Sequence, residues 1–333
     1  MVTPAPAPAL PGISPGLQAR LDLGLAAVED LLTARVDHDD PFIAEANAHL
    51  LRAGGKRFRP LLTLLAAELG SGINDDVVAA GAGVELTHLA SLYHDDVMDD
   101  ALTRRGAPSA NAKYDNSTAI LVGDLLFGTA SDIIADLGPE AVKIQSQTFI
   151  RLCSGQIRDD RACPPGQDPN AYYLGVLADK TGVLIATAAR YGALLSGCSR
   201  ETIATLIEYG ERIGVAFQLA DDLIDISSEM DVLGKAPGTD IREGKRTLPI
   251  IHALASQDPA DARLQHLLRL SEPSEDQVAE ALALLRPHPA MQRAQEETDA
   301  VAAGAKAVLA NVPDGEVKSA LMDLADRVVA RRS

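Results

Sequence analysis

Apolar residues recur at three- and four-residue spacing along most of this 333-residue chain, and stretches of strict alternation are few. That spacing matches one face of an α-helix, so the pattern predicts an all-α protein. The expected helices cover residues 17–35, 42–53, 59–69, 75–100, 117–137, 140–161, 171–196, 200–228 and 248–256, with shorter helices up to residue 331.

The residues at several expected helix ends support these boundaries. Pro139 suits the first position of a helix, where its missing N–H costs nothing. Asn74 suits an N-cap, with acidic Asp75 following in the first turn. Ser274 and Gln277 have the spacing of a capping box.

The first sixteen residues differ from the rest. They begin M-V-T-P-A-P-A-P-A-L-P-G, which predicts a disordered or polyproline-like tail over 1–16, followed by one domain over 17–333. This start has neither the basic region nor the apolar core of a secretory signal, and we expect no transmembrane segment. Cys153, Cys163 and Cys198 have irregular spacing, which predicts free thiols in a reducing compartment and a cytoplasmic protein.

Composition narrows the possible partners. The formal net charge is −17, aromatic residues make up 3% and tryptophan is absent. Nucleic-acid binding needs a basic footprint and often aromatic stacking, so we expect no nucleic-acid partner. An acidic protein that binds an anionic ligand must instead gather its basic residues locally.

Two aspartate clusters of the form D-D-x-x-D lie far apart in the chain. Their members are Asp95, Asp96 and Asp99 in the first cluster and Asp221, Asp222 and Asp225 in the second. On a helix this spacing crowds like charges onto one face, which is unfavourable unless a cation neutralises them. Carboxylates without His or Cys suit Mg²⁺, which usually completes its shell with substrate phosphates. Two such clusters facing one cavity would hold one diphosphate between them.

Three segments gather basic residues as the charge argument requires. G-G-K-R-F-R-P, at 54–60, places three cations before a helix, where backbone N–H groups also attract anions. Arg104 and Arg105 follow the first aspartate cluster, and a charged loop at 234–249 follows the second. Each segment taken alone could also be a solvated basic turn.

Taken in order, these motifs resemble those of the trans-type (all-E) polyprenyl diphosphate synthases. From about residue 50 to 249 the matching pieces are G-G-K-R-F-R-P, E-L-T-H-L-A-S-L-Y-H-D-D-V-M-D followed by R-R-G, V-G-D-L-L, D-K-T-G, F-Q-L-A-D-D-L-I-D and G-K-A-P-G-T-D-I-R-E-G-K-R-T-L-P. The resemblance implies a bundle of long antiparallel helices around one central cavity, and a homodimer.

The resemblance also implies a role for each matching residue. The six aspartates would hold Mg²⁺, three ions with substrate bound, against an allylic diphosphate. That diphosphate would be bound by Arg104, Lys180 and Lys235, with Thr181 and Gln218 lining its site and stabilising positive charge. Isopentenyl diphosphate would be bound by Lys56, Arg57, Arg59, His88 and Arg105. His94 and Asp100 are expected to be neighbours of the site and not members of it.

The expected reaction follows from these groups. Mg²⁺ and cationic side chains neutralise the departing diphosphate, so that its carbon–oxygen bond ionises to an allylic cation. The double bond of isopentenyl diphosphate attacks that cation, and the released pyrophosphate is a plausible base for the proton lost afterwards. Water must be excluded from the cavity because it would quench the cation.

Small residues on the helix that enters the first cluster bear on product length. These chain-length candidates are Gly83, Thr87, Ala90 and Ser91. In the family, a bulky aromatic residue four or five positions before the cluster ends the tunnel early. Twelve residues before Asp95 span about 18 Å of helix, which predicts a heptaprenyl to decaprenyl product, as in menaquinone biosynthesis. Alternatively, the small residues only allow close helix packing, or Leu126 or Phe127 forms the floor of the tunnel.

Three further functions share part of this pattern. A synthase of the same class could stop at a farnesyl or geranylgeranyl product. A class I terpene cyclase would replace the second cluster with an Asn/Ser/Glu triad and lack an isopentenyl site. A non-catalytic partner subunit would have lost part of the metal clamp, and none is missing here. Release of a long apolar product could also involve peripheral membrane contact.

Overall fold

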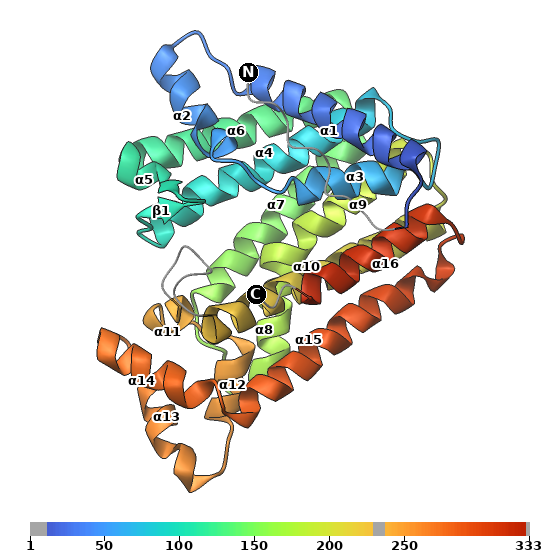
Figure 1. Cartoon of the computed structure of the whole chain (residues 1–333). Helices are drawn as coiled ribbons and strands as arrows, with labels where there is room; N and C mark the ends of the chain where they lie inside the picture. Colours follow the sequence, from blue (N-terminus) through green and yellow to red (C-terminus); the bar gives the residue numbers. More distant parts are fainter. Residues whose placement is uncertain (1–11, 229–236, 331–333) are drawn as a thin grey trace. The chain divides into compact units, whose positions relative to one another are not determined.

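The computed structural model describes residues 12–228 and 237–330, and most of these are helical (Figure 1). The helices are α1 (Pro15–Arg35), α2 (Pro41–Arg52), α3 (Phe58–Ala67), α4 (Asp75–Met98), α5 (Ala110–Lys113), α6 (Asn116–Asp136), α7 (Pro139–Asp159), α8 (Pro169–Leu177), α9 (Val183–Leu195), α10 (Arg200–Ser227), α11 (Thr239–Arg242), α12 (Leu248–Leu254), α13 (Ala262–Leu267), α14 (Glu275–Leu285), α15 (Pro289–Val308) and α16 (Glu316–Val329). A π turn (Ala178–Gly182) joins α8 to α9, and strands β1 (Thr103–Arg104) and β2 (Ala107–Pro108) form a short antiparallel ribbon.

The all-α prediction is confirmed, and so are three of the predicted helix starts. Pro139 is the first residue of α7. The Asn74 side chain accepts the N–H of Val77 at 2.9 Å, which satisfies one of the donors left open at the start of α4. Ser274 and Gln277 form the reciprocal capping box of α14.

Several predicted boundaries were wrong. The helix expected at 75–100 ends at Met98, so Asp99 is its C-cap and Asp100 has a left-handed φ of 46°. The helix expected at 171–196 is interrupted by the π turn. The predicted tail is too long, because α1 already begins at Pro15. Its residues 1–11 lie outside the described part of the chain.

Contacts divide the chain into two compact units. The first unit contains the described residues up to Phe149 together with Leu184–Ile207 and Asn311–Leu321. In it α4 packs against α1, α3 and α6, which lie side by side in Figure 1. Its buried core includes Leu32, Leu86 and Leu126. The single domain expected over 17–333 stays a prediction.

The second unit contains Ile150–Val183, Glu208–Ala310 and the described residues from Met322 onward. In it α12 packs against α8, α13 and α15, and α13 packs against α14. Tyr173, Leu219 and Leu248 belong to one of its buried clusters, contributed by α8, α10 and α12. This cluster supports the second aspartate motif, because Leu219 lies just before it on α10.

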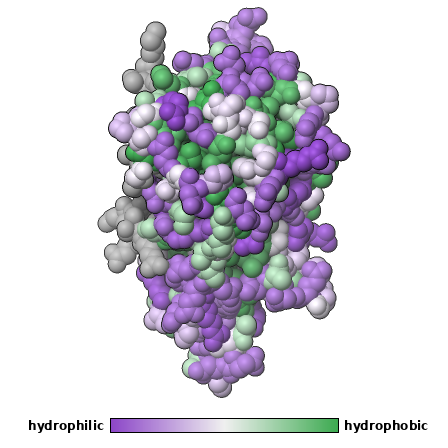
Figure 2. All heavy atoms as spheres, turned by 90° about the vertical axis from the view of Figure 1, so that its right-hand side faces the viewer, coloured by the Kyte–Doolittle hydropathy of each residue, from purple (hydrophilic) through white to green (hydrophobic). Residues whose placement is uncertain are grey.

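The face shown in Figure 2 carries many hydrophilic side chains, with hydrophobic side chains visible between them. Among residues 12–228 and 237–330, α6 is the one helix that is long and apolar enough to span a membrane by length and composition. Its Leu126 is fully buried in the core, whereas Leu121 is 63% exposed. A core helix that is apolar on two faces has the same composition as a membrane span.

Candidate active site

The first aspartate cluster lies at the end of α4, and its three members have different surroundings. Asp96 is fully buried and accepts a hydrogen bond from Arg104 Nε at 2.6 Å and another from the N–H of Ala110 at 3.2 Å. Asp95 is half-buried and Asp99 is exposed. Asp96 therefore fixes the segment after the helix, while the first and third aspartates are more accessible to a bound ion.

The β1–β2 ribbon explains how two adjacent arginines separate. Thr103 pairs with Pro108 and Arg104 with Ala107, so Arg105 and Gly106 form a two-residue turn. Both turn residues have positive φ, 55° and 77°, as hairpin turns of this length require. The turn directs Arg105 to the carbonyl oxygens of Leu50 in α2 and of Gly54 in the G-G-K-R-F-R-P segment.

This contact brings predicted isopentenyl diphosphate ligands together in the first unit. Among these ligands, Arg57 differs from the others because its side chain is already paired with carboxylates. Its guanidinium donates to Glu29 at 2.7 Å and to Glu85 at 3.2 Å. Burial lowers the pKa of Arg57, but these ion pairs outweigh burial and raise it overall. Because its donors already have carboxylate partners, the geometry favours a structural role for Arg57.

Arg59 has the opposite character. Its Nε is buried and has no hydrogen-bond partner among the described residues. Burial lowers the pKa of Arg59 to about 10, and the charge of Arg105 adds to the shift, although Glu85 opposes it. A buried, unsatisfied cationic donor is costly unless a ligand completes it, which makes Arg59 the best candidate here for contact with an anion. Lys56, three residues earlier, is exposed.

His88 lies near the same arginines. Burial lowers its pKa well below 6.5, and the charges of Arg59, Arg105, Arg104 and Arg57 add to the shift. His88 is therefore neutral near pH 7, and its imidazole can donate one hydrogen bond and accept another.

This shift predicts a pH dependence of stability. As pH falls below 6.5, the unfolded chain takes up a proton at His88 and the folded protein does not, so folding stability is lost. We expect His88→Gln to remove this effect, so that between pH 6.5 and 5.5 the wild type loses about 1 kcal/mol more stability than the variant. Urea denaturation at the two pH values measures the difference, and equal losses would contradict it.

The second aspartate cluster lies on α10. Asp222 is buried and accepts hydrogen bonds from the Tyr173 hydroxyl at 2.5 Å and from Gln218 Nε2 at 3.3 Å. Burial raises the pKa of Asp222 to about 7, and the charge of Asp221 adds to the shift, although the two hydrogen bonds oppose it. Asp221 is half-buried. As in the first cluster, the second aspartate is held by protein partners.

Asp225, the third member, organises the loop that follows. Its carboxylate accepts the N–H groups of Thr239 and Asp240 at 3.2 and 3.1 Å, at the start of α11. Burial raises the pKa of Asp240 well above its ordinary value, and the charges of Asp222 and Asp225 add to the shift. Asp240 Oδ2 is buried without a hydrogen-bond partner in the described chain. Asp240 belongs to one of the matching motifs, but no role could be assigned to it from the sequence.

The remaining allylic-site candidates belong to the second unit. Lys180 and Thr181 lie in the π turn, and the Thr181 hydroxyl is 3.5 Å from Gln218 Oε1. Lys180 Nζ donates to Asp159 at 2.6 Å. Lys235 lies outside the described residues.

The chain-length candidates all lie on α4, and two of them contact neighbouring helices. A Cβ added to Gly83 would lie 2.8 Å from Ile134 Cδ1, so this glycine allows close packing of α6. The Thr87 hydroxyl accepts a hydrogen bond from Gln145 Nε2 at 2.7 Å. Ala90 is buried in the core and Ser91 is half-buried. At Gly83, therefore, the geometry favours close helix packing as the role of the small residue.

The two residues predicted as alternatives for the floor of the tunnel both lie in the first unit. Leu126 is fully buried in the core, and Phe127 stacks on Phe149 with ring centroids 3.8 Å apart. Both side chains have packing partners within the first unit. Their role in product length stays a prediction.

The chemistry of the donor set fits Mg²⁺. Both clusters offer carboxylate oxygens alone, the hard ligands that Mg²⁺ prefers. Among the described residues, no group of three His, Cys, Asp or Glu side chains is arranged to hold a metal ion. Mg²⁺ usually keeps waters and takes one or two carboxylates plus substrate phosphates, so the donors fit an ion that arrives with a diphosphate.

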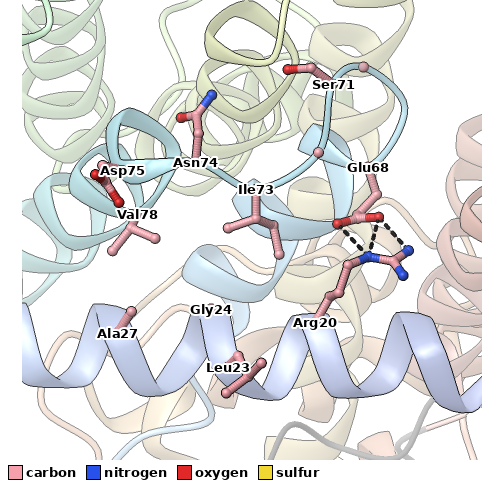
Figure 3. A pocket seen from close by; sticks show the side chains of 12 residues that line it. Arg20, Leu23, Gly24, Ala27, Glu68, Ser71, Ile73, Asn74, Asp75 and Val78 are labelled. Carbon is pink, nitrogen blue, oxygen red and sulfur yellow. Dashed lines mark hydrogen bonds and ion pairs between the residues drawn. The ribbon is translucent and has the colours of Figure 1, made fainter.

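A separate depression of about 480 Å³ lies in the first unit (Figure 3). It is lined by residues of α1 and of the connection from α3 to α4, and the ion pair of Arg20 with Glu68 lies at its side. It contains none of the predicted site residues. This depression is therefore separate from the predicted site.

The structure brings Arg59, His88 and Arg105 together in the first unit and Thr181, Gln218 and Asp222 together in the second, and it adds residues that sequence reasoning missed. The missed partners are Glu29, Glu85, Gly155, Asp159, Tyr173 and Asp240. One signal was available, because an isolated glycine in a helical pattern, as at Gly155, often has a packing or functional reason. Convergence of the two aspartate clusters on one diphosphate stays a prediction.

The chain is similar to known proteins over almost its whole length. Residues 40–285 match the family described as polyprenyl synthetase. The chain is 46% identical over 330 residues to the nonaprenyl diphosphate synthase of Mycobacterium tuberculosis, covering 98% of each chain.

The chain is also similar to solved structures over almost its whole length. A polyprenyl synthase from Caulobacter crescentus, complexed with calcium and isoprenyl diphosphate, superposes with a TM-score of 0.89 at 34% identity, covering 98% of this chain and 100% of the other. A geranylgeranyl pyrophosphate synthase from Corynebacterium glutamicum, also with calcium and isoprenyl diphosphate, gives 0.86 at 41% identity, with 97% and 99% covered. The chain therefore belongs to the polyprenyl synthetase family, and the predicted prenyltransferase class is confirmed.

Proposed function

We propose that this prenyltransferase extends an allylic diphosphate with isopentenyl units in trans, depends on Mg²⁺, and makes a long product of heptaprenyl to decaprenyl length. The observation that supports this reaction is that the middle aspartate and the flanking aspartates of each motif have different surroundings. In each, the middle aspartate is buried and fixed by protein groups, Arg104 for Asp96 and Tyr173 for Asp222. The flanking aspartates are more exposed, although Asp225 also accepts two N–H groups at the start of α11. The flanking carboxylates are therefore more accessible to an ion that arrives with a diphosphate.

The chain's own residues supply most of the chemistry. Bound Mg²⁺ would neutralise negative charge on the diphosphate leaving group. Lys180 and Arg104 add positive charge near the same group. Arg59 and Arg105, with neutral His88, hold the second diphosphate, so that the two substrates react as neighbours.

Product length rests on a separate argument. The relative with 46% identity over 98% of the chain is a nonaprenyl diphosphate synthase. The two chain-length candidates nearest the first cluster, Ala90 and Ser91, carry small side chains. A geranylgeranyl pyrophosphate synthase is also similar, at 41% identity. A short product is therefore the possibility to exclude by experiment.

A terpene cyclase and a non-catalytic subunit both fit less well. Terpene cyclases lack an isopentenyl site, whereas the Nε of Arg59 here is buried without a hydrogen-bond partner in the described part of the chain. A non-catalytic subunit has no need for two intact aspartate motifs. Incubation with isopentenyl diphosphate, labelled farnesyl diphosphate and Mg²⁺, followed by chromatography, tests the proposal. A product series that stops at four isoprene units would refute the long product, and a cyclic hydrocarbon would refute the reaction.

The tunnel assignment predicts that Ala90→Phe shortens the product without abolishing turnover. Ala90 is 1% exposed, so a phenyl ring must occupy space within the helix bundle. Chromatography of the products measures the change in length.

Ala82→Phe is the matched control, because Ala82 is equally buried on α4 but lies outside the proposed tunnel residues. Both variants should lose comparable stability through overpacking, about 1–3 kcal/mol. Only Ala90→Phe should change the product. An unchanged product in a folded Ala90→Phe protein contradicts the assignment.

The proposal extends to assembly and location. A homodimer would cover the exposed apolar side chains Ile120, Leu121 and Leu125 of α6, which are 42%, 63% and 40% exposed. Light scattering would then give twice the mass of one chain. A cytoplasmic enzyme that releases its product by peripheral membrane contact, for quinone side chains, completes the proposal.

A further inference from the structure

One face of α7 holds the π turn that carries Lys180 and Thr181. Gly155 is buried on this face, and a Cβ added to it would lie 2.4 Å from the backbone nitrogen of Lys180. No side chain other than hydrogen fits at that distance. The π turn therefore rests directly on the backbone of α7 at Gly155.

Charged residues of α7 fix the same turn from both sides of Gly155. Arg151 Nε and Arg158 Nη1 donate to Asp179 at 2.8 and 2.9 Å. Arg151, Gly155 and Asp159 are spaced by four residues, so they share one helix face. Asp159 Oδ2 accepts from Lys180 Nζ at 2.6 Å.

Asp159 also contacts a second lysine. Lys245 Nζ, from the loop after α11, lies 3.3 Å from Asp159 Oδ2 and 2.8 Å from Asp160 Oδ1. Asp159 thus joins the π turn to the loop after α11. All these residues belong to the second unit.

We propose that Asp159 is a positioning residue that holds the Lys180 ammonium in place for the allylic diphosphate. The ammonium has three donors, so it can keep its bond to Asp159 and still donate to a phosphate oxygen. Holding a long flexible side chain in advance removes part of the entropy cost of binding. This inference rests on the proposed role of Lys180 as a diphosphate ligand.

Charge and position predict opposite effects, which makes the inference testable. Asp159→Asn removes a negative charge near an anionic substrate, so charge alone would strengthen binding and lower KM for farnesyl diphosphate. Loss of positioning weakens binding instead. We expect KM for farnesyl diphosphate to rise about fivefold to tenfold, the scale of one ordinary net hydrogen bond, with KM for isopentenyl diphosphate unchanged.

Asp160→Asn is the matched control. It removes the same charge one residue later, and Asp160 accepts a hydrogen bond from Lys245, whereas Lys180 acts on it through charge alone. Its KM for farnesyl diphosphate should stay the same or fall slightly. A KM for Asp159→Asn that equals that of Asp160→Asn would overturn the inference.

Lys180→Met separates this inference from the function it rests on. If Lys180 binds the diphosphate, Lys180→Met raises KM for farnesyl diphosphate, and adding Asp159→Asn to it produces little further change. An unchanged KM for farnesyl diphosphate in Lys180→Met would contradict the proposed role of Lys180 as a diphosphate ligand. Full additivity of the two substitutions would show that Asp159 acts by another route.

Gly155→Ala is a second test, and it should affect both kcat and KM. The added methyl group must push the π turn away from α7, so kcat should fall along with the rise in KM for farnesyl diphosphate. Circular dichroism and thermal unfolding establish whether the variant is folded. A folded Gly155→Ala enzyme with wild-type kinetics would contradict the requirement for close contact.

Discussion

We expect Asp95→Asn to lower kcat about a thousandfold, because stabilisation of charge by a bound metal ion contributes several kcal/mol to the barrier and each 1.36 kcal/mol is tenfold in rate. Asp95 lies in the last turn of α4 beside Asp96, which is fully buried and paired with Arg104. The asparagine keeps the shape of the side chain and removes its charge. Steady-state kinetics with varied Mg²⁺ measures the loss, which should be accompanied by a higher Mg²⁺ requirement.

Asp100→Asn is the control for this substitution. Asp100 is exposed, lies next to the cluster and has a φ of 46°, a conformation that asparagine tolerates well. It should retain nearly full activity with the same dependence on Mg²⁺. Equal losses in Asp95→Asn and Asp100→Asn would mean that general negative charge matters and not a metal ligand.

The second large effect is expected at Arg59. Its buried Nε has no partner among the described residues, so a bound diphosphate would complete it. Arg59→Ala should raise KM for isopentenyl diphosphate about 10- to 100-fold, the scale of hydrogen bonds to charged groups. KM for the allylic substrate should change little. Initial rates with each substrate varied in turn separate the two constants.

Arg57→Ala provides the contrast. Arg57 is two residues earlier in the same segment, but its guanidinium is already bound to Glu29 and Glu85. Its removal leaves buried Glu85 without that partner, so the variant should lose stability, with a smaller change in KM for isopentenyl diphosphate. A larger effect on KM at Arg57 than at Arg59 would reverse the assignment of the two arginines.

Much of the fold could be predicted because most helices here carry strong local signals. Apolar periodicity placed the long helices, and residues such as Asn74 and Pro139 fixed their starts. The ribbon after the first cluster was missed because two-residue strands leave no periodic pattern. The π turn was missed because Lys180 and Thr181 lie within a continuous helical pattern, and only packing against Gly155 distinguishes it.

The site could be predicted where the residue types and their spacing indicate the chemistry. It could not be predicted where the role of a residue depends on a partner that is distant in the sequence. Paired aspartates and clustered arginines can be recognised from their spacing. The sequence did not reveal that Arg57 is neutralised by Glu29, 28 residues away, whereas Arg59 is not. Nor could it place Tyr173 against Asp222, 49 residues away. Contacts of such separation are set by tertiary packing.

The π turn has a consequence for how this family member can change. A π turn contains one residue more than an α turn, and each residue of an α-helix rotates the chain by about 100°. Deleting a single residue between α8 and α9 would turn the lysine ammonium away from its aspartate, although every side chain involved would still be present. The orientation of this group is thus stored in the number of residues in a helix, a property that exchanging one amino acid for another leaves untouched.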